Sequence, residues 1–277
     1  DGLRMPPEPA VPELRKSSDA HRRTCDFQYR PLCLAGFGHP IGSLKRHRVF
    51  GTSGSTGRVS TDTVSAMTGL PLTELKQELI ETGRDFHRRG WSLGTSSNYS
   101  VVASRDPLQL LSTASGFDKG RLKPEQFVVV DGHGQRLDPA HPKPSAETLL
   151  HTVLARTVGA GAVLHTHSIW GTLLSEALQP AGRLQIAGYE MLKGLSGVST
   201  HDTRVSIAVV SNTQDIASLA VSLEARFSEG DPDLRYGFLM AGHGLYTWGS
   251  DLAEARRHIE VLEFLMEVVG TRRGWGS

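Results

Sequence analysis

The sequence predicts an α/β fold of three layers, in which helices cover both faces of a central mixed sheet that is largely antiparallel. Two observations carry this prediction. Short apolar segments with strand character are joined by short turns in one part of the chain and by amphipathic helices elsewhere. The 277 residues are 38% hydrophobic and 21% charged, a balance typical of a globular protein that buries a sizeable core.

The first predicted element is a helix, because apolar residues recur at helical spacing between Leu72 and Phe86. Pro71 precedes this run, and a basic turn followed by Gly90 is a typical helix stop. Short turns then separate three segments with strand character, so we expect an antiparallel meander. These segments are residues 99–103, 108–112 and 127–130.

The rest of the chain alternates helices and strands. Behind Pro144, an amphipathic run opens at Ser145 and ends at Gly159, which predicts a helix. The last helix opens at Asp251 with Glu254 three residues later, an arrangement that resembles a capping box. Between them we expect a strand ending at His165, a helix at 169–178, strands at 184–187 and 205–210, a helix at 215–227, and a strand ending at Ala241 before a hairpin-like turn.

A change of composition near residue 60 divides the chain. Residues 1–60 hold 10 Lys and Arg against 5 Asp and Glu, and 6 of the 14 prolines. We expect a basic, disordered extension there and one catalytic domain at 61–277. Both cysteines, Cys25 and Cys33, fall in the extension, which argues against a disulfide-built secreted fold. With no export signal or membrane-spanning run apparent, we expect a cytoplasmic protein.

The basic extension raises the possibility of a nucleic-acid binder. Its charge clusters, Arg22-Arg23 and the run at 45–48, are too sparse to specify such a site, and a solvated extension is favoured. We therefore expect a small-molecule substrate and neither a nucleic-acid nor a membrane partner.

Three histidines predict a metal site. His165 and His167 close one apolar run, and His243 follows another. Side chains at i and i+2 of an extended segment point the same way, so both imidazoles can reach one ion. Zinc suits such ligands, and three protein ligands with an open position are typical of a catalytic zinc site. The alternative is that these histidines are only hydrogen-bonded polar groups at strand ends.

Three loops rich in small residues predict a phosphate site. Backbone N–H groups and hydroxyls of the loop Gly94–Asn98 can cradle an anion. Thr113–Gly116 ends another strand, and Ser145 stands at the start of a predicted helix, where N–H groups favour phosphate. Each loop alone is ordinary turn chemistry, so the prediction depends on their occurring together with the histidines.

Two carboxylates are candidates for proton transfer. Glu147 lies in the first turn of a predicted helix, where it could bind the metal, act as a base, or only stabilise the helix dipole. Glu190 follows a strand and stands near Lys193, so it could exchange a proton beside a metal-bound carbonyl or only form a surface ion pair.

Six segments in this order carry a family resemblance. They are R-G-W-S-L-G-T-S-S-N-Y-S at 89–100, S-G-F-D-K-G at 115–120, K-P-S-A-E-T at 143–148, H-T-H-S at 165–168, E-M-L-K-G at 190–194 and G-H-G-L at 242–245. Together they resemble the class II aldolase/adducin family over residues 70–270. The second and fifth segments narrow the resemblance to members that dehydrate a sugar phosphate.

The resemblance implies roles for individual residues. His165, His167 and His243 would bind one zinc ion per subunit, and Glu190 would be the catalytic acid and base. Glu147 occupies the position at which aldolases of the family keep a glutamate for metal and proton transfer, and it ranks second. The phosphate would be bound by Ser97, Asn98, Ser115, Gly116 and Ser145, with Lys119 as a helper. The resemblance also implies a homotetramer with sites near the subunit interfaces.

Other activities remain open at this point. The same site could cleave a carbon–carbon bond of a ketose 1-phosphate, as a class II aldolase does, or epimerise its substrate. A non-catalytic, adducin-like scaffold is disfavoured because all three histidines are present.

Overall fold

In the computed structural model, residues 71–274 are described, and the extension predicted at 1–60 lies outside them. The core is an eight-stranded sheet of order β3-β2-β1-β4-β8-β7-β6-β5. Every neighbouring pair is antiparallel except β6 and β7, which are parallel. The strands are β1 (Asn98–Arg105), β2 (Leu108–Thr113), β3 (Phe127–Asp131), β4 (Ala162–Thr166), β5 (Arg183–Ala187), β6 (Arg204–Val210), β7 (Phe238–Met240) and β8 (Gly244–Gly249).

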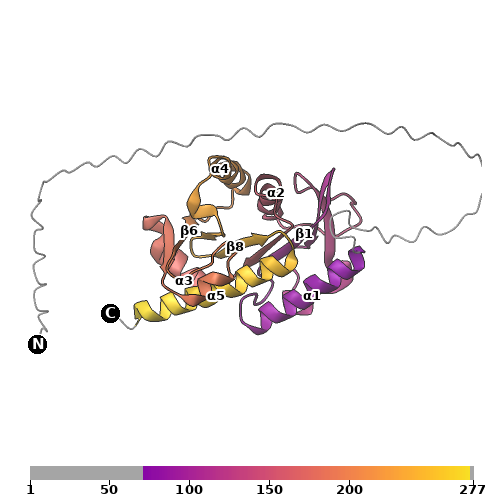
Figure 1. The fold of residues 1–277 in the computed structure, drawn as a ribbon. Helices are drawn as coiled ribbons and strands as arrows, with labels where there is room; N and C mark the ends of the chain where they lie inside the picture. The colour runs from indigo at the N-terminus through magenta and orange to yellow at the C-terminus, as the bar shows by residue number, and fades with distance from the viewer. Residues whose placement is uncertain (1–70, 275–277) are drawn as a thin grey trace, which may run out of the picture. The chain divides into compact units, whose positions relative to one another are not determined.

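Helices cover both faces of this sheet, so the predicted three-layer α/β/α architecture is confirmed. Helices α1, α3 and α5 pack on one face, and α2 and α4 pack together on the other (Figure 1). Two large clusters of buried apolar side chains fill the two spaces between the layers. The helices are α1 (Leu72–Arg88), α2 (Thr148–Thr157), α3 (Ile169–Leu178), α4 (Ile216–Ser228) and α5 (Leu252–Gly274).

Two local predictions need correction. The helix expected from Ser145 begins at Thr148, so Ser145 lies in the preceding turn and Glu147 is the N-cap residue. The hairpin-like turn expected after Ala241 continues into β8, a strand whose six residues are all buried. Side chains of β8 belong to both apolar clusters, Leu245 to one and Tyr246 and Trp248 to the other, so both faces of the strand are covered. Its sequence therefore lacks the alternation that marks a half-exposed strand.

Strand register gathers the predicted site at one edge of the sheet. Asn98, the first residue of β1, pairs with His165 near the end of β4, and Thr166 pairs with Leu245 of β8. On the other side of β1, Ser100 pairs with Ser112. The loops before β1 and after β2, the end of β4 and the turn between β7 and β8 therefore meet at this edge.

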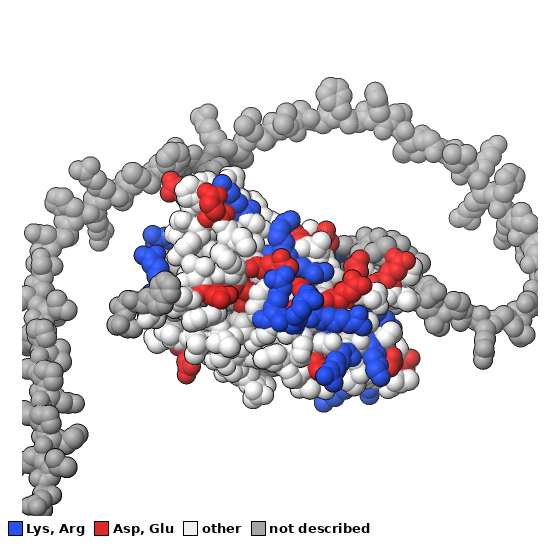
Figure 2. Space-filling view, turned by 90° about the horizontal axis from the view of Figure 1, so that it is seen from below, with Lys and Arg blue, Asp and Glu red and all other residues white. Residues whose placement is uncertain are grey.

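The helical face formed by α1, α3 and α5 carries mixed charge. Figure 2 shows acidic and basic side chains interspersed over part of this face, while much of the remainder carries neither. Ile169, Leu173 and Phe264 are exposed apolar residues of α3 and α5. None of the helices in the described part of the chain is both long enough and apolar enough to span a membrane.

Candidate metal centre

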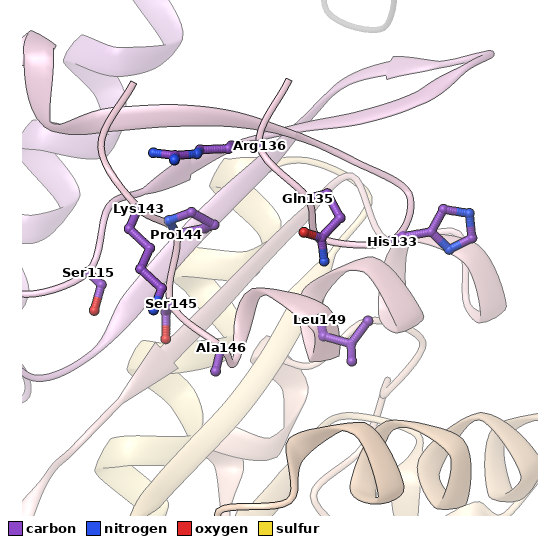
Figure 3. Close-up of a pocket in the computed structure, with 10 residues that line it drawn as sticks. Ser115, His133, Gln135, Arg136, Lys143, Pro144, Ser145, Ala146 and Leu149 are labelled. Carbon is purple, nitrogen blue, oxygen red and sulfur yellow. The ribbon is translucent and has the colours of Figure 1, made fainter. Parts of the chain in front are cut away.

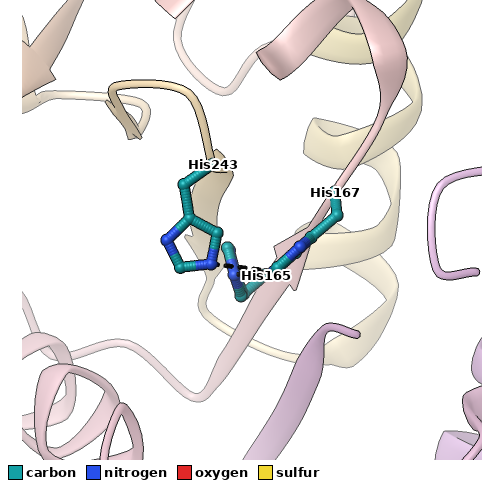
Figure 4. Close-up of side chains that lie close together, drawn as sticks. All are labelled: His165, His167 and His243. Atoms are coloured by element: carbon teal, nitrogen blue, oxygen red, sulfur yellow. Dashed lines mark hydrogen bonds between the residues drawn. The ribbon is translucent and has the colours of Figure 1, made fainter. Parts of the chain in front are cut away.

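The three predicted histidines lie together. Nε2 of His165 is 2.7 Å from Nε2 of His167, which is 3.0 Å from Nε2 of His243 (Figure 4). One ligand atom from each ring lies within 4.8 Å of the other two. His165 is on β4, His167 follows the strand, and His243 is in the turn between β7 and β8. Three imidazole nitrogens thus converge on one point, as a metal ligand set requires.

The surroundings keep these rings neutral. Burial, reinforced by His167 and His243, holds the pKa of His165 well below its usual value. Burial first and then His243 and Lys119 lower the pKa of His167 to about 4, and burial also lowers that of His243. His165 lies with Nδ1 2.9 Å from the carbonyl oxygen of Leu245, so a proton on Nδ1 leaves the Nε2 lone pair free. Three neutral rings whose Nε2 atoms face one another suit zinc, so the residues fit the predicted ion.

A glycine allows the two histidine-bearing segments to approach each other. A β-carbon on Gly244 would lie 2.0 Å from the carbonyl oxygen of Thr166. Gly242, two residues earlier, has a φ of +62°, a conformation that favours glycine. The G-H-G segment therefore turns tightly against β4 and brings His243 to His165.

Glu147 is the carboxylate beside the histidines. Its two carboxylate oxygens lie 3.8 Å from Nε2 of His165 and 3.6 Å from Nε2 of His243. The side-chain amide of Asn98 donates a 2.6 Å hydrogen bond to Glu147 and holds it there. Glu147 is thus placed to bind a metal ion or to exchange a proton next to one.

Aromatic packing fixes the ring of His165 from behind. The ring of Tyr246 stacks on it, with centroids 3.8 Å apart and planes 13° from parallel. Burial, and then the charge of Glu147, raise the pKa of Tyr246 well above its usual value, so its hydroxyl stays protonated. His151 packs edge-on against this tyrosine and is itself fully buried.

The predicted phosphate loops are neighbours. An isolated β-bridge joins Ala114 to Pro144, and the backbone N–H of Ser115 donates to the carbonyl of Lys143 at 3.0 Å. Ser115 and Ser145 consequently line one pocket of about 590 Å³. In Figure 3, Ser115, Lys143 and Ser145 lie at one end of this pocket and His133 at the other.

The other predicted phosphate residues are differently placed. Ser97 and Asn98 are largely buried, and their side chains bond to Trp91 and Glu147. Gly116 is exposed and has a φ of +82°. Of these three residues, Gly116 alone is exposed, whereas the side chains of Ser97 and Asn98 are engaged within the chain.

Lys119 lies behind the loops and is 1% exposed. Its ammonium group donates to the carbonyl of Phe117 at 2.7 Å and to that of Thr95 at 3.4 Å. Burial lowers the pKa of Lys119 to about 8, against the opposing effects of Asp118 and Glu147. One buried cation therefore ties two of the three loops together.

Glu190 does not join this cluster within one chain. It opens the short 3-10 helix η4 (Glu190–Gly194) after β5, and β5 ends at Ala187 opposite Arg204, the first residue of β6. The histidine edge lies at the other end of β6, where Val210 pairs with Met240. Six residue steps of β6 separate the two ends, or about 20 Å at strand spacing.

The contacts of Glu190 are local. Its side chain is 68% exposed, forms an ion pair with Lys193 at 2.6 Å, and has one oxygen 2.9 Å from Nδ1 of His201. The hydrogen bond from Lys193 lowers the pKa of this carboxyl, so it is ionised. Within one chain, Glu190 therefore forms the surface ion pair with Lys193 that was the alternative prediction, and its side chain faces solvent.

Comparison with known proteins assigns the family. The family model described as "Class II Aldolase and Adducin N-terminal domain" matches residues 77–269. This chain belongs to the class II aldolase and adducin family. The resemblance seen in the six sequence segments is thus confirmed.

Two similar members of the class II aldolase and adducin family carry the name methylthioribulose-1-phosphate dehydratase. The protein from Pseudomonas fluorescens (strain Pf0-1) is 46% identical over 195 residues, which are 70% of this chain and 91% of the relative. That from Sorangium cellulosum (strain So ce56) is 46% identical over 191 residues, 69% of this chain and 88% of the relative. Nearly the whole length of these relatives is therefore matched.

A solved aldolase has the same fold. The structure of an L-fuculose 1-phosphate aldolase matches with a TM-score of 0.60 and 24% identity, over 74% of this chain and 89% of that one. At that identity the likeness shows the fold and leaves the substrate undecided.

The spacing of the histidines and their position after strand-like segments predicted the metal site, but several neighbours of the site were not predicted. Lys143 is the first residue of the K-P-S-A-E-T segment, two residues before Ser145, and its positive charge beside the predicted phosphate loop was the signal in the sequence. Tyr246 and His151 gave no such signal, because both reach the site only through packing between β8 and α2.

Proposed function

We propose that this chain dehydrates 5-methylthioribulose 1-phosphate to 2,3-diketo-5-methylthiopentyl 1-phosphate, a step of methionine salvage, with one Zn²⁺ per subunit. One observation supports this proposal best: three neutral imidazoles converge next to Glu147 and the predicted phosphate loops. Relatives of 46% identity bear the name of this dehydratase. We place the reaction in the cytoplasm, as expected for a metabolic enzyme.

His165, His167 and His243 would hold the zinc ion. Bound there, zinc would act as a Lewis acid toward the substrate's C2 carbonyl and make the hydrogen on C3 acidic. Ser115 and Ser145, the backbone of Gly116, and the loop at Ser97 and Asn98 would bind the phosphate on C1 with Lys119 behind them. Holding the phosphate fixes which carbon meets the base.

Glu190 is our candidate for the acid and base. Its carboxylate would remove the proton from C3 and then, protonated, give that proton to the hydroxyl leaving C4 as water. The C3–C4 enol so formed tautomerises to the diketone, and the net change is the loss of one water. Because Glu190 lies far from the histidines of its own chain, it would act in the site of a neighbouring subunit.

We therefore propose a homotetramer in which each site lies at a subunit interface. The exposed apolar residues Ile169, Leu173 and Phe264 offer surface for such contacts. Glu147 would remain in the site of its own chain, where its oxygens could contribute to metal binding or to a second proton transfer.

Incubation with 5-methylthioribulose 1-phosphate tests the reaction. Mass spectrometry should show a product lighter by one water, and a chelator should abolish turnover until Zn²⁺ is restored. Glu190→Gln should lower kcat by about 10²–10⁴-fold, since it removes the proton-transfer group. Full turnover by this variant would remove Glu190 from the chemistry.

Mixed tetramers test the placement of Glu190. Glu190→Gln and His167→Ala subunits should each be inactive alone, but sites that combine an intact histidine set with a partner's Glu190 should regain activity. Random mixing of equal amounts should restore activity in about one quarter of the sites. If mixing restores nothing while each variant still forms tetramers, Glu190 does not act across the interface.

Retro-aldol cleavage of a ketose 1-phosphate is the second candidate. The position of Glu147 favours it, because this carboxylate lies next to the histidines without help from another subunit. Cleavage between C3 and C4 would yield dihydroxyacetone phosphate and an aldehyde. Detection of these products, with no dehydrated one, would replace the dehydratase assignment.

A further inference from the structure

Glu263 is a buried acidic residue that the proposed reaction does not use. It lies in the middle of α5, and it is 3% exposed. No ion pair with a lysine, arginine or histidine is recorded for it among residues 71–274. Burying a carboxyl group without a cation costs free energy, so the hydrogen bonds of Glu263 must offset that cost.

Those hydrogen bonds go to the segment that carries the two neighbouring histidines. The hydroxyl of Thr166 donates to Glu263 at 2.5 Å, and the hydroxyl of Ser168 also hydrogen-bonds to this carboxyl. Helix α5 packs against β4, and Figure 4 shows it behind the strand. Along residues 165–168 the histidines alternate with Thr166 and Ser168, so the two hydroxyl groups point away from the imidazoles. The carboxyl of Glu263 therefore holds this segment from the side opposite the imidazoles.

This contact reaches beyond the end of the strand. The ladder of β4 with β8 ends at Thr166, so His167 has no partner in it. Its backbone N–H instead donates to the carbonyl of Trp91 at 2.8 Å, and Ser168 accepts from Gly171 to cap α3. Glu263 is bonded to residues on both sides of His167 and therefore fixes the chain where the sheet no longer does.

We propose that Glu263 is a positioning residue that holds His165 and His167 in the geometry required to bind the metal ion. It touches neither substrate nor metal and acts through Thr166 and Ser168. The inference rests on the metal site of the proposed function but not on the identity of the reaction. Residues that support metal ligands from behind typically alter metal affinity by about 10–100-fold when they are removed.

The test is the Zn²⁺ dissociation constant of the full chain, measured by competition with a chromogenic chelator. Glu263→Leu removes both acceptor oxygens and should weaken Zn²⁺ binding by about 10–100-fold. Glu263→Gln keeps one acceptor oxygen and should weaken it less. Glu267→Gln is the matched control, because it removes an exposed carboxylate one turn further along α5 and should leave the affinity unchanged.

Thr166→Val tests the same contact from the strand and keeps a β-branched side chain of similar size. It should also weaken Zn²⁺ binding, and it decides the matter if Glu263→Leu does not fold, as judged by circular dichroism of the zinc-free protein. The inference is overturned if Thr166→Val, and Glu263→Leu where it folds, bind Zn²⁺ within twofold of the wild type.

The two proposals fail separately. A wild-type protein without dehydratase activity whose Zn²⁺ affinity still falls in Glu263→Leu would refute the reaction and leave the positioning role intact. If the wild type is an active dehydratase and both variants keep its Zn²⁺ affinity, the positioning role of Glu263 is refuted and the proposed reaction stands.

Discussion

The buried ring of His151 predicts that the fold loses stability in mild acid. His151 is fully buried on α2, with Nδ1 2.7 Å from the hydroxyl of Ser100 and with no recorded partner for Nε2. Burial lowers the pKa of His151 to about 3. The folded protein therefore keeps this ring neutral at pH values where the unfolded chain protonates it.

The sign and size follow from the two pKa values. Between the unfolded value of about 6.5 and the folded value of about 3, the unfolded chain binds more protons, so the free energy of unfolding falls as the pH falls. The slope for one such group is at most about 1.4 kcal/mol per pH unit. From pH 6.5 to pH 5 the loss is about 1.6 kcal/mol, and above about pH 7.5 the group has almost no effect.

Urea unfolding of the metal-free protein at several pH values between 7.5 and 4.5 measures this effect. His151→Asn cannot titrate, although its amide can still reach Ser100, so its unfolding free energy should fall less steeply than that of the wild type. Because all other groups titrate in both proteins, the difference in slope belongs to His151. Parallel pH profiles for the two proteins below pH 6.5 would refute the reasoning.

Three further substitutions test the site and its support. Asn98→Ala removes the hydrogen bond that holds Glu147, so we expect kcat to fall by about 10–100-fold with the fold intact, measured by steady-state kinetics and circular dichroism. Gly244→Ala places a β-carbon 2.0 Å from a backbone oxygen and should lower the unfolding free energy by about 1–3 kcal/mol in urea titrations. Lys119→Met removes the bonds to two anion loops, so KM for a phosphorylated substrate should rise while Zn²⁺ affinity is retained; an unchanged KM would contradict its role.

The parts of the site that depend on local pattern were predictable from sequence. Alternation along an extended segment requires His165 and His167 to share a side, and a strand before each histidine places them at a sheet edge. The loops before β1 and after β2 were recognisable from their small residues. The strand order that brings these segments together was not predictable, because β1, β4 and β8 are neighbours in the sheet although they are far apart in sequence.

The relation between the two carboxylates was not predictable, because it depends on which end of a strand faces the histidines. β5 and β6 are antiparallel, so a residue just after β5 lies at the opposite end of the sheet from one just after β6. The sequence around Glu190 does not reveal whether β5 runs parallel or antiparallel to β6, and so it does not reveal at which end of the sheet Glu190 lies. Glu263 was also beyond sequence analysis, since a glutamate on an amphipathic helix normally faces solvent.

Charge at the site argues for an anionic substrate. Neutral imidazoles leave the charge of a bound divalent cation intact, and Glu147 is the one carboxylate with a recorded contact to these rings among residues 71–274. Lys119 adds a buried positive group behind the loops, and Lys143 lies in the adjoining pocket. A sugar phosphate would bring the compensating charge, and its phosphate end would settle toward the lysines while its carbonyl end faces the histidines. Electrostatics would thus orient such a substrate before any base acts, in keeping with the proposal that a neighbouring subunit supplies the base.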